Sequence, residues 1–159
     1  MNFFRILSVW VLLGAFIGTG IYYFVTQDAR EIKNAWTGLL AAVEKTEPGN
    51  RIVNLARANR VPDFFAEPFM VDATPHGGIY TDREELRSQA LALAEYATRV
   101  SFDYEIVELL IDSPRALMII DGSAEVIYDH RTAQFEGTGH VHWLKTDEGW
   151  KSAQVMLED

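Results

Sequence analysis

Cysteine is absent from all 159 positions of the chain. Its absence excludes a disulfide-stapled fold, a thiol nucleophile and lipid attachment through a thiol. Two further absences exclude common enzyme classes. The sequence lacks the G-x-S-x-G motif of serine hydrolases, and Gly137-Thr138-Gly139 lies within an expected strand rather than at the strand-to-helix turn of a dinucleotide site.

Basic residues are scarce beside the acidic ones. The chain has 14 Lys and Arg against 23 Asp and Glu, a net charge of −9. Arg5 is the one charged residue before Asp28, so the remaining 13 basic and 23 acidic residues give the rest of the chain a net charge of −10. Such a surface repels nucleic acid and anionic lipid headgroups, and we therefore predict no nucleic-acid partner.

A long uncharged run opens the chain, from Ile6 to Val25. A helix needs about 20 apolar residues to cross a bilayer. Tyr22 and Tyr23 stand at the far end of the run, where aromatic rings favour a membrane interface. No small-residue cleavage site follows, which favours a retained anchor over a cleaved signal peptide. We predict a transmembrane anchor over residues 1–27, with residues 6–25 in the membrane.

The few charges that flank the run predict its orientation. Arg5 and the amino terminus precede it, whereas Asp28, Arg30 and Glu31 follow it and nearly cancel. Cytoplasmic flanks carry an excess of positive charge. We predict a single-pass protein of the cell membrane, with a cytoplasmic N-terminus and an extracytoplasmic domain over residues 28–159.

Helical spacing marks the first half of that domain. One helix face after the anchor carries Ile32, Trp36, Leu39, Leu40 and Val43. A shorter helix is expected from Asn50 to about Asn59, before Pro62. Thr81 and Glu84 form a T-x-x-E capping box, which predicts the start of a third helix.

The last third of the chain changes to the period of strands. Strands are expected over Val100–Ile111, Ala116–Asp129, Ala133–Lys145 and Trp150–Leu157. Links this short join antiparallel neighbours. The predicted fold class is therefore α+β, with the helices packed on one face of a curved antiparallel sheet that forms a cone.

A register for the two middle strands follows if Ile127 lies opposite Gln134. It pairs Met118 with Trp143 and Ile120 with Val141 on an apolar face, and it sets Asp121 against His140 on a polar face. The apolar face also carries glycines, at Gly122, Gly137 and Gly139. Missing side chains there predict room for a pocket.

The order of elements, and the last hairpin Trp143-Leu144-Lys145-Thr146-Asp147-Glu148-Gly149-Trp150-Lys151, resembles the nuclear transport factor two-like superfamily. SnoaL-like polyketide cyclases and ketosteroid isomerase belong to that superfamily, whose cystatin-like α+β cone often holds an apolar ligand. The resemblance, with strict strand alternation, implies a pocket lined by Met118, Ile120, Val141, Trp143, Gln154 and Met156. Gln154 and Met156 stand where some relatives carry histidines, which favours binding over catalysis.

Two functions remain open on these residues. We predict a membrane-anchored, noncatalytic binding or assembly domain for an apolar small molecule or a protein partner, able to form a homodimer through its sheet. The alternative is a small SnoaL-like enzyme that uses Asp121 and His140 as an acid–base pair; a structural subunit of a membrane assembly is a third. His140 and His142 lack an evident third ligand, so we predict no metal, and we predict no cofactor.

Overall fold

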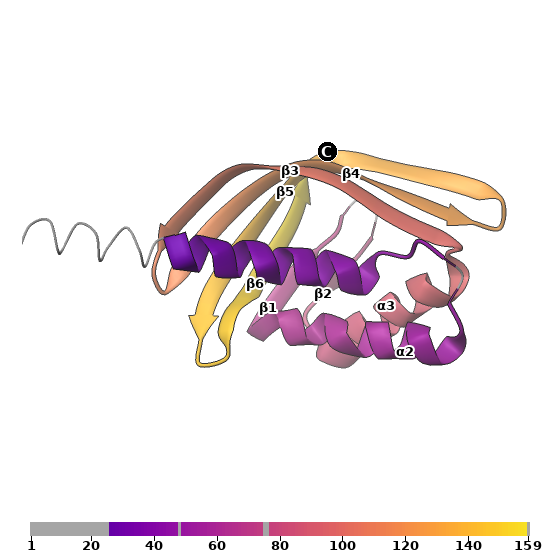
Figure 1. Cartoon of the computed structure of the whole chain (residues 1–159), viewed down its shortest axis with the longest axis horizontal. Helices are drawn as coiled ribbons and strands as arrows, with labels where there is room; N and C mark the ends of the chain where they lie inside the picture. Colours follow the sequence, from indigo (N-terminus) through magenta and orange to yellow (C-terminus); the bar gives the residue numbers. More distant parts are fainter. Residues whose placement is uncertain (1–25, 48, 75–76, 159) are drawn as a thin grey trace, which may run out of the picture.

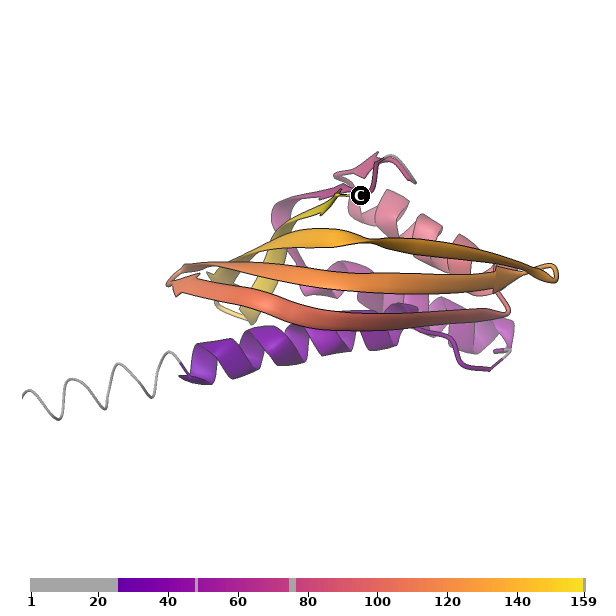
Figure 2. The ribbon, with the colours of Figure 1, turned by 90° about the horizontal axis from the view of Figure 1, so that it is seen from above.

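A six-stranded sheet with helices on one face makes up the part of the chain that the computed structural model describes, residues 26–47, 49–74 and 77–158. Figure 1 shows the long strands arching over the helices, and Figure 2 shows them lying side by side above the helical layer. The predicted α+β class is confirmed. We call the side of the sheet that faces the helices the concave face and the opposite side the convex face.

The predicted membrane span, Ile6 to Val25, lies outside the described residues. Among the residues that are described, no helix combines the length and the apolar content that a bilayer crossing requires. The anchor over residues 1–27 therefore stays a prediction.

Three α-helices form the described helical layer. The leading helix covers residues 26–43 and buries Ile32, Trp36 and Leu39, as its spacing predicts. Helix α2 (Arg51–Arg60) and a short 3-10 helix, η1 (Val61–Phe64), follow. Helix α3 (Arg83–Tyr96) starts one residue later than the Thr81 capping box predicts. The N-cap residue is Asp82, whose carboxylate accepts a hydrogen bond from the Glu85 N–H.

The strands of the sheet lie in the order β2-β1-β6-β5-β4-β3. The predicted antiparallel meander is present as β3 (Arg99–Asp112), β4 (Arg115–Tyr128), β5 (Arg131–Thr146) and β6 (Gly149–Glu158). The sheet also contains β1 (Phe65–Asp72) and the short β2 (Ile79–Tyr80), and β1 runs parallel to β6. A wholly antiparallel sheet is thus wrong: the long chain between β1 and β6 supplies the crossover that parallel neighbours need.

The register between β4 and β5 differs from the predicted one by two residues. Tyr128 pairs with Arg131, so Asp129 and His130 alone make the turn, and both adopt left-handed backbone conformations with φ of 45° and 62°. This geometry is typical of a two-residue type I′ hairpin, usually built from Asn-Gly or Asp-Gly. A shift of two residues changes every partner but keeps every side chain on its predicted face.

An extra residue in β6 changes which side chains face the helices. Ser152 pairs with Trp143 and Gln154 pairs with His142, so Ala153 is a β-bulge. Beyond it, Val155 lies opposite the buried Val141 on the concave face. Strict alternation had placed Gln154 and Met156 there; that prediction is wrong, because the bulge reverses the alternation.

Candidate functional site

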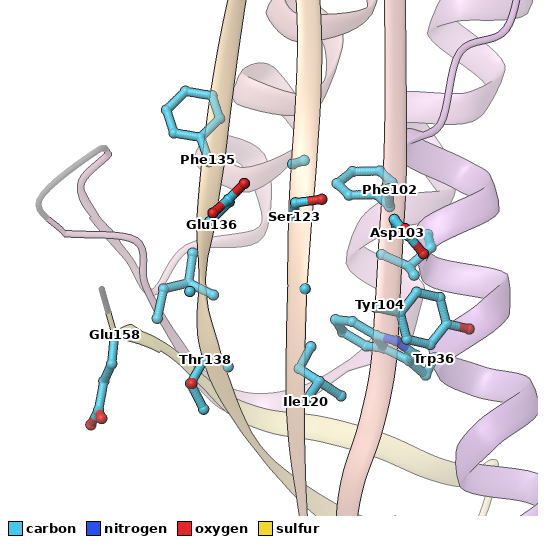
Figure 3. Close-up of a pocket in the computed structure, with 16 residues that line it drawn as sticks. Trp36, Phe102, Asp103, Tyr104, Ile120, Ser123, Phe135, Glu136, Thr138 and Glu158 are labelled. Carbon is cyan, nitrogen blue, oxygen red and sulfur yellow. The ribbon is translucent and has the colours of Figure 1, made fainter.

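A cavity of about 190 Å³ lies on the concave face, between the leading helix and strands β3 to β5. The end of β6 adds Leu157 and Glu158, and Figure 3 shows the lining drawn from these strands and from the helix. The cavity sits where β4 and β5 extend toward their shared turn. Its larger side chains are mostly apolar: Trp36, Leu40, Phe102, Tyr104, Ile120, Ala124, Phe135 and Leu157.

Glycines form part of the cavity lining, at positions where a side chain would collide with neighbouring atoms. A Cβ at Gly139 would lie 2.8 Å from Ile120 Cγ1, and one at Gly122 would lie 2.7 Å from the backbone oxygen of Asp103. Both distances are shorter than real side chains allow. With Gly137 in the same lining, these positions leave a stretch of the concave face without side-chain volume.

Trp36 and Tyr104 form one wall. Their rings meet edge to face, with centroids 6.1 Å apart and planes at 86°, and Figure 3 shows them side by side across β3. Such aromatic pairs stabilise each other beyond simple burial. The Trp36 Nε1 is buried without a hydrogen-bond partner among the described residues. The wall therefore offers the cavity ring surface rather than charge.

Polar residues also border the cavity, but their side chains belong to the other face. Ser123 pairs with Asp103 and with Glu136, and Thr138 pairs with Asp121. These residues alternate with the glycines and with Ala124, which lie on the concave face, so their side chains point away from the helices. Apolar atoms consequently dominate the interior of the cavity.

The structure divides the six predicted pocket residues among three places. Ile120 lines the cavity. Met118, Val141 and Trp143 are at most 1% exposed and belong to the closed core beside it. Gln154 and Met156 lie on the convex face, opposite His142 and His140. The predicted face was right for four of the six, but the open space lies nearer to the β4–β5 turn.

Asp121 and His140 do not form the predicted pair. In the observed register Asp121 lies opposite Thr138, whose hydroxyl donates to its Oδ1 at 2.7 Å, and His140 lies opposite Ile119. The His140 Nε2 lies 3.7 Å from a carboxylate oxygen of Glu158. The two-residue turn at Asp129 and His130 moves the partners apart. Both residues remain on the convex face, outside the cavity.

His140 and His142 share the convex face of β5, as predicted. Across the described ranges, no group of three or more His, Asp or Glu side chains is arranged to hold a metal ion.

A buried carboxylate fastens the start of the leading helix to the last hairpin. Asp28 Oδ1 accepts hydrogen bonds from Lys145 Nζ at 2.7 Å and from Trp150 Nε1 at 3.1 Å. Burial acts to raise the pKa of Asp28, but these hydrogen bonds and the lysine charge outweigh it, so the pKa lies below its ordinary value. No local sequence pattern indicates this contact, because its partners are more than a hundred residues apart.

The sequence matches no protein-family model and no curated protein. Solved structures do match the fold. A nuclear transport factor two-like protein with a cystatin-like fold, from Novosphingobium aromaticivorans, aligns with a TM-score of 0.67 over 87% of this chain and 86% of its own, at 8% identity. The chain has the nuclear transport factor two-like fold. The predicted resemblance is thereby confirmed at the level of fold.

Other similar structures of this fold carry enzyme names. A protein from Novosphingobium aromaticivorans with a provisional assignment as scytalone dehydratase has a TM-score of 0.69 at 13% identity, covering 84% of each chain. A type 2 hexachlorocyclohexane dehydrochlorinase has a TM-score of 0.67 at 11% identity, covering 84% of this chain and 85% of its own. Identities this low describe a shared nuclear transport factor two-like scaffold, on which unrelated functions occur.

Proposed function

We propose that this protein is a membrane-anchored, noncatalytic binding domain whose cavity takes up a small apolar molecule. The observation that carries the proposal is the glycine-floored cavity on the concave face, walled by Trp36 and Tyr104. Apolar lining favours an apolar ligand because burial removes its surface from water.

The size of the cavity limits the ligand. A dry cavity of about 150 Å³ holds a benzene ring, whereas drug-sized ligands occupy roughly 300 to 1,000 Å³. At about 190 Å³ the cavity suits one aromatic ring, a small fused pair of rings such as indole, or a short alkyl chain. We therefore expect a ligand of this size rather than a steroid or a polyketide.

Membrane anchoring rests on the sequence. The uncharged run from Ile6 to Val25 has the length of a span, and Arg5 favours a cytoplasmic N-terminus. The proposed location is the cell membrane, with residues 28–159 on the extracytoplasmic side. Alkaline carbonate extraction of membranes, together with protease protection of the C-terminal domain, tests both parts of this assignment.

Titration with indole tests the cavity in the full chain reconstituted in nanodiscs. We expect the indole N–H resonance of Trp36, identified from the Trp36→Phe spectrum, to shift on saturation. Ala124→Leu fills the cavity and should weaken indole binding roughly tenfold or more. Ala41→Leu makes the same change at an exposed position of the leading helix and should leave binding unchanged. Equal affinity in wild type and Ala124→Leu would show that the cavity is not the site.

Acid–base catalysis is the alternative function, and the enzyme names among similar structures keep it worth testing. On this chain its two residues lie outside the cavity and have other partners. Asp121→Asn and His140→Ala should therefore leave indole binding and cellular phenotype unchanged. A lost phenotype with normal folding in both variants would favour the enzyme.

The convex face supports self-association. Leu117 and Ile119 lie there beside the two histidines, and Figures 1 and 2 show no described helix covering this face. Isologous contact between two such faces would give a homodimer. Sedimentation of the full chain in detergent should show a dimer that Ile119→Asp converts to a monomer; a wild-type monomer contradicts this part of the proposal.

A further inference from the structure

Helix α2 differs in charge from the rest of the chain. Its ten residues include Arg51, Arg57 and Arg60 and no acidic residue, although the whole chain carries a net charge of −9. It also exposes apolar side chains: Ile52 is 79% exposed and Leu55 is 40% exposed. Isolated exposed apolar residues are ordinary, but a run of them on one basic helix is not.

The exposed side of α2 forms a stripe that points away from the core. Ile52, Leu55, Ala56 and Asn59 recur at helical spacing and are all exposed, whereas Ala58 on the opposite side is buried. Figures 1 and 2 place α2 in the helical layer, away from the convex face. We call Ile52, Leu55, Ala56 and Asn59 the outer stripe.

Two arginines flank the outer stripe and remain available to a partner. Arg60 is exposed, and Arg51 makes a contact of 3.6 Å with Glu95 through a side chain that is 90% exposed. Arg57, by contrast, donates to the backbone oxygen of Glu44 and is held by the domain. Tyr96 follows Glu95, the partner of Arg51, at the end of α3 and is 79% exposed. Tyrosine rings favour membrane interfaces, so Tyr96 adds to the exposed surface near the N-terminal end of α2.

We infer that the outer stripe of α2 lies on an anionic membrane surface, with Arg51 and Arg60 at the lipid phosphates. Apolar side chains flanked by arginines on a short helix are the pattern of interfacial binding. The inference rests on the proposed anchor, which holds the domain beside the bilayer. The net negative charge predicts that anionic lipid repels most of the surface of the domain. The basic helix α2 is the part of the surface that can approach such lipid.

This contact would fix the orientation of the whole domain. The described part of the leading helix, residues 26–43, is about 27 Å long at the usual rise per residue and separates the anchor from α2, so the contact requires this helix to lie along the bilayer. With α2 on the membrane, the helical layer faces the lipid and the convex face points away from it. The convex face then stays open to a second copy.

Single-cysteine labelling tests the contact, and a chain without cysteine is suited to it. The full chain with Ile52→Cys carries an environment-sensitive NBD label and is reconstituted in nanodiscs of phosphatidylcholine, with or without phosphatidylglycerol. We expect a blue shift and protection from iodide in the anionic discs. Val107→Cys, on an exposed residue of β3, is the matched control and should show neither change.

Charge variants measure the arginine contribution. Each arginine near an anionic surface accounts for roughly a fivefold change in binding, so Arg51→Gln with Arg60→Gln should lower the ratio of docked to free α2 by roughly 25-fold. Arg99→Gln with Arg115→Gln removes the same charge from the sheet and should leave the ratio unchanged. Circular dichroism checks that both double variants are folded.

The outcomes separate docking from anchoring and from ligand binding. Chain that fails to co-elute with nanodiscs overturns the anchor, and the docking inference with it. Co-elution without a blue shift at position 52 overturns docking alone. A blue shift that appears without anionic lipid, and that grows with protein concentration, identifies a second copy as the occupant and also overturns the inference. Indole binding reports on the cavity independently of all three results.

Discussion

The two faces of the central sheet come from the same strands and yet differ sharply in environment. On the concave face of β4 and β5, Met118 and Val141 are fully buried. On the convex face, three residues away along each strand, Asp121 accepts a hydrogen bond from Thr138 in an exposed setting. Side chains alternate along a strand, so a single step separates core from surface. The described helices cover one face only, and this cover decides which set of side chains forms the core.

The largest expected effect lies on the concave face. Trp143→Ala should lower the free energy of unfolding by about 4 kcal/mol, because Trp143 is 1% exposed and its removal leaves a large void. His142→Ala, its neighbour on the convex face, should change stability by less than about 0.5 kcal/mol. Urea denaturation followed by circular dichroism compares them, and similar losses in the two variants would contradict the contrast between the faces.

The next effect concerns the link that closes the concave face at one end. Asp28→Asn should lower the free energy of unfolding by about 2 kcal/mol at neutral pH, because the amide oxygen can still accept from Lys145 and Trp150 but lacks the negative charge that strengthens both hydrogen bonds. The folded pKa of Asp28 is depressed, so its contribution is present above the unfolded pKa and is lost as pH falls through the folded pKa. The difference between wild type and variant should therefore shrink in strong acid. A difference independent of pH would exclude the carboxylate charge as its cause.

A matched pair of threonine substitutions sharpens the comparison further. Val141→Thr keeps the volume but buries a hydroxyl on the concave face and should cost about 1.5 kcal/mol. Val107→Thr makes the same substitution at an exposed residue of β3, where water can satisfy the hydroxyl. We expect a lower melting temperature for Val141→Thr than for Val107→Thr in thermal denaturation; the reverse order would contradict the contrast between buried and exposed positions of the sheet.

The smallest expected effect is on the convex face itself. Asp121→Asn and His140→Ala should each change the free energy of unfolding by less than about 0.5 kcal/mol, because their contacts with Thr138 and Glu158 lie at the surface, where water screens them. Urea midpoints for the two variants measure this. A loss above 2 kcal/mol for either one would place that residue in a buried contact and reopen its role in the site.

The fold class could be predicted because the hydrophobic periodicity of a strand does not depend on which residues it pairs with. The predicted pairing of Asp121 with His140 was wrong by two residues, yet each of them, like Met118 and Val141, lies on the predicted face. The turn was missed because Asp129 and His130 adopt left-handed conformations that Asn-Gly or Asp-Gly would have announced. The bulge at Ala153 was missed because nothing in the local pattern marks it, and it alone moved Gln154 and Met156 to the convex face.

The sequence predicted an apolar pocket beside glycines but placed it at the wrong end of the strands. Gly122, Gly137 and Gly139 indicated a hollow in the apolar face, and all three line the cavity. The ring pair of Trp36 and Tyr104 joins a helix to a strand that lies far along the chain, so no local pattern connects them. The predicted pocket was accordingly centred on Trp143, which is closed core.

By itself the amino-acid sequence determined the periods of the helices and strands and the separation of apolar from polar faces, because these follow from neighbouring residues. It also determined the acidity of the domain and excluded disulfide and thiol chemistry, because these follow from residue counts. The tertiary structure alone decided the two-residue register, the bulge, the parallel pairing of β1 with β6 and the link from Asp28 to Lys145 and Trp150. These features depend on contacts between distant segments, whose free energies are settled only when the whole sheet and its helices pack together.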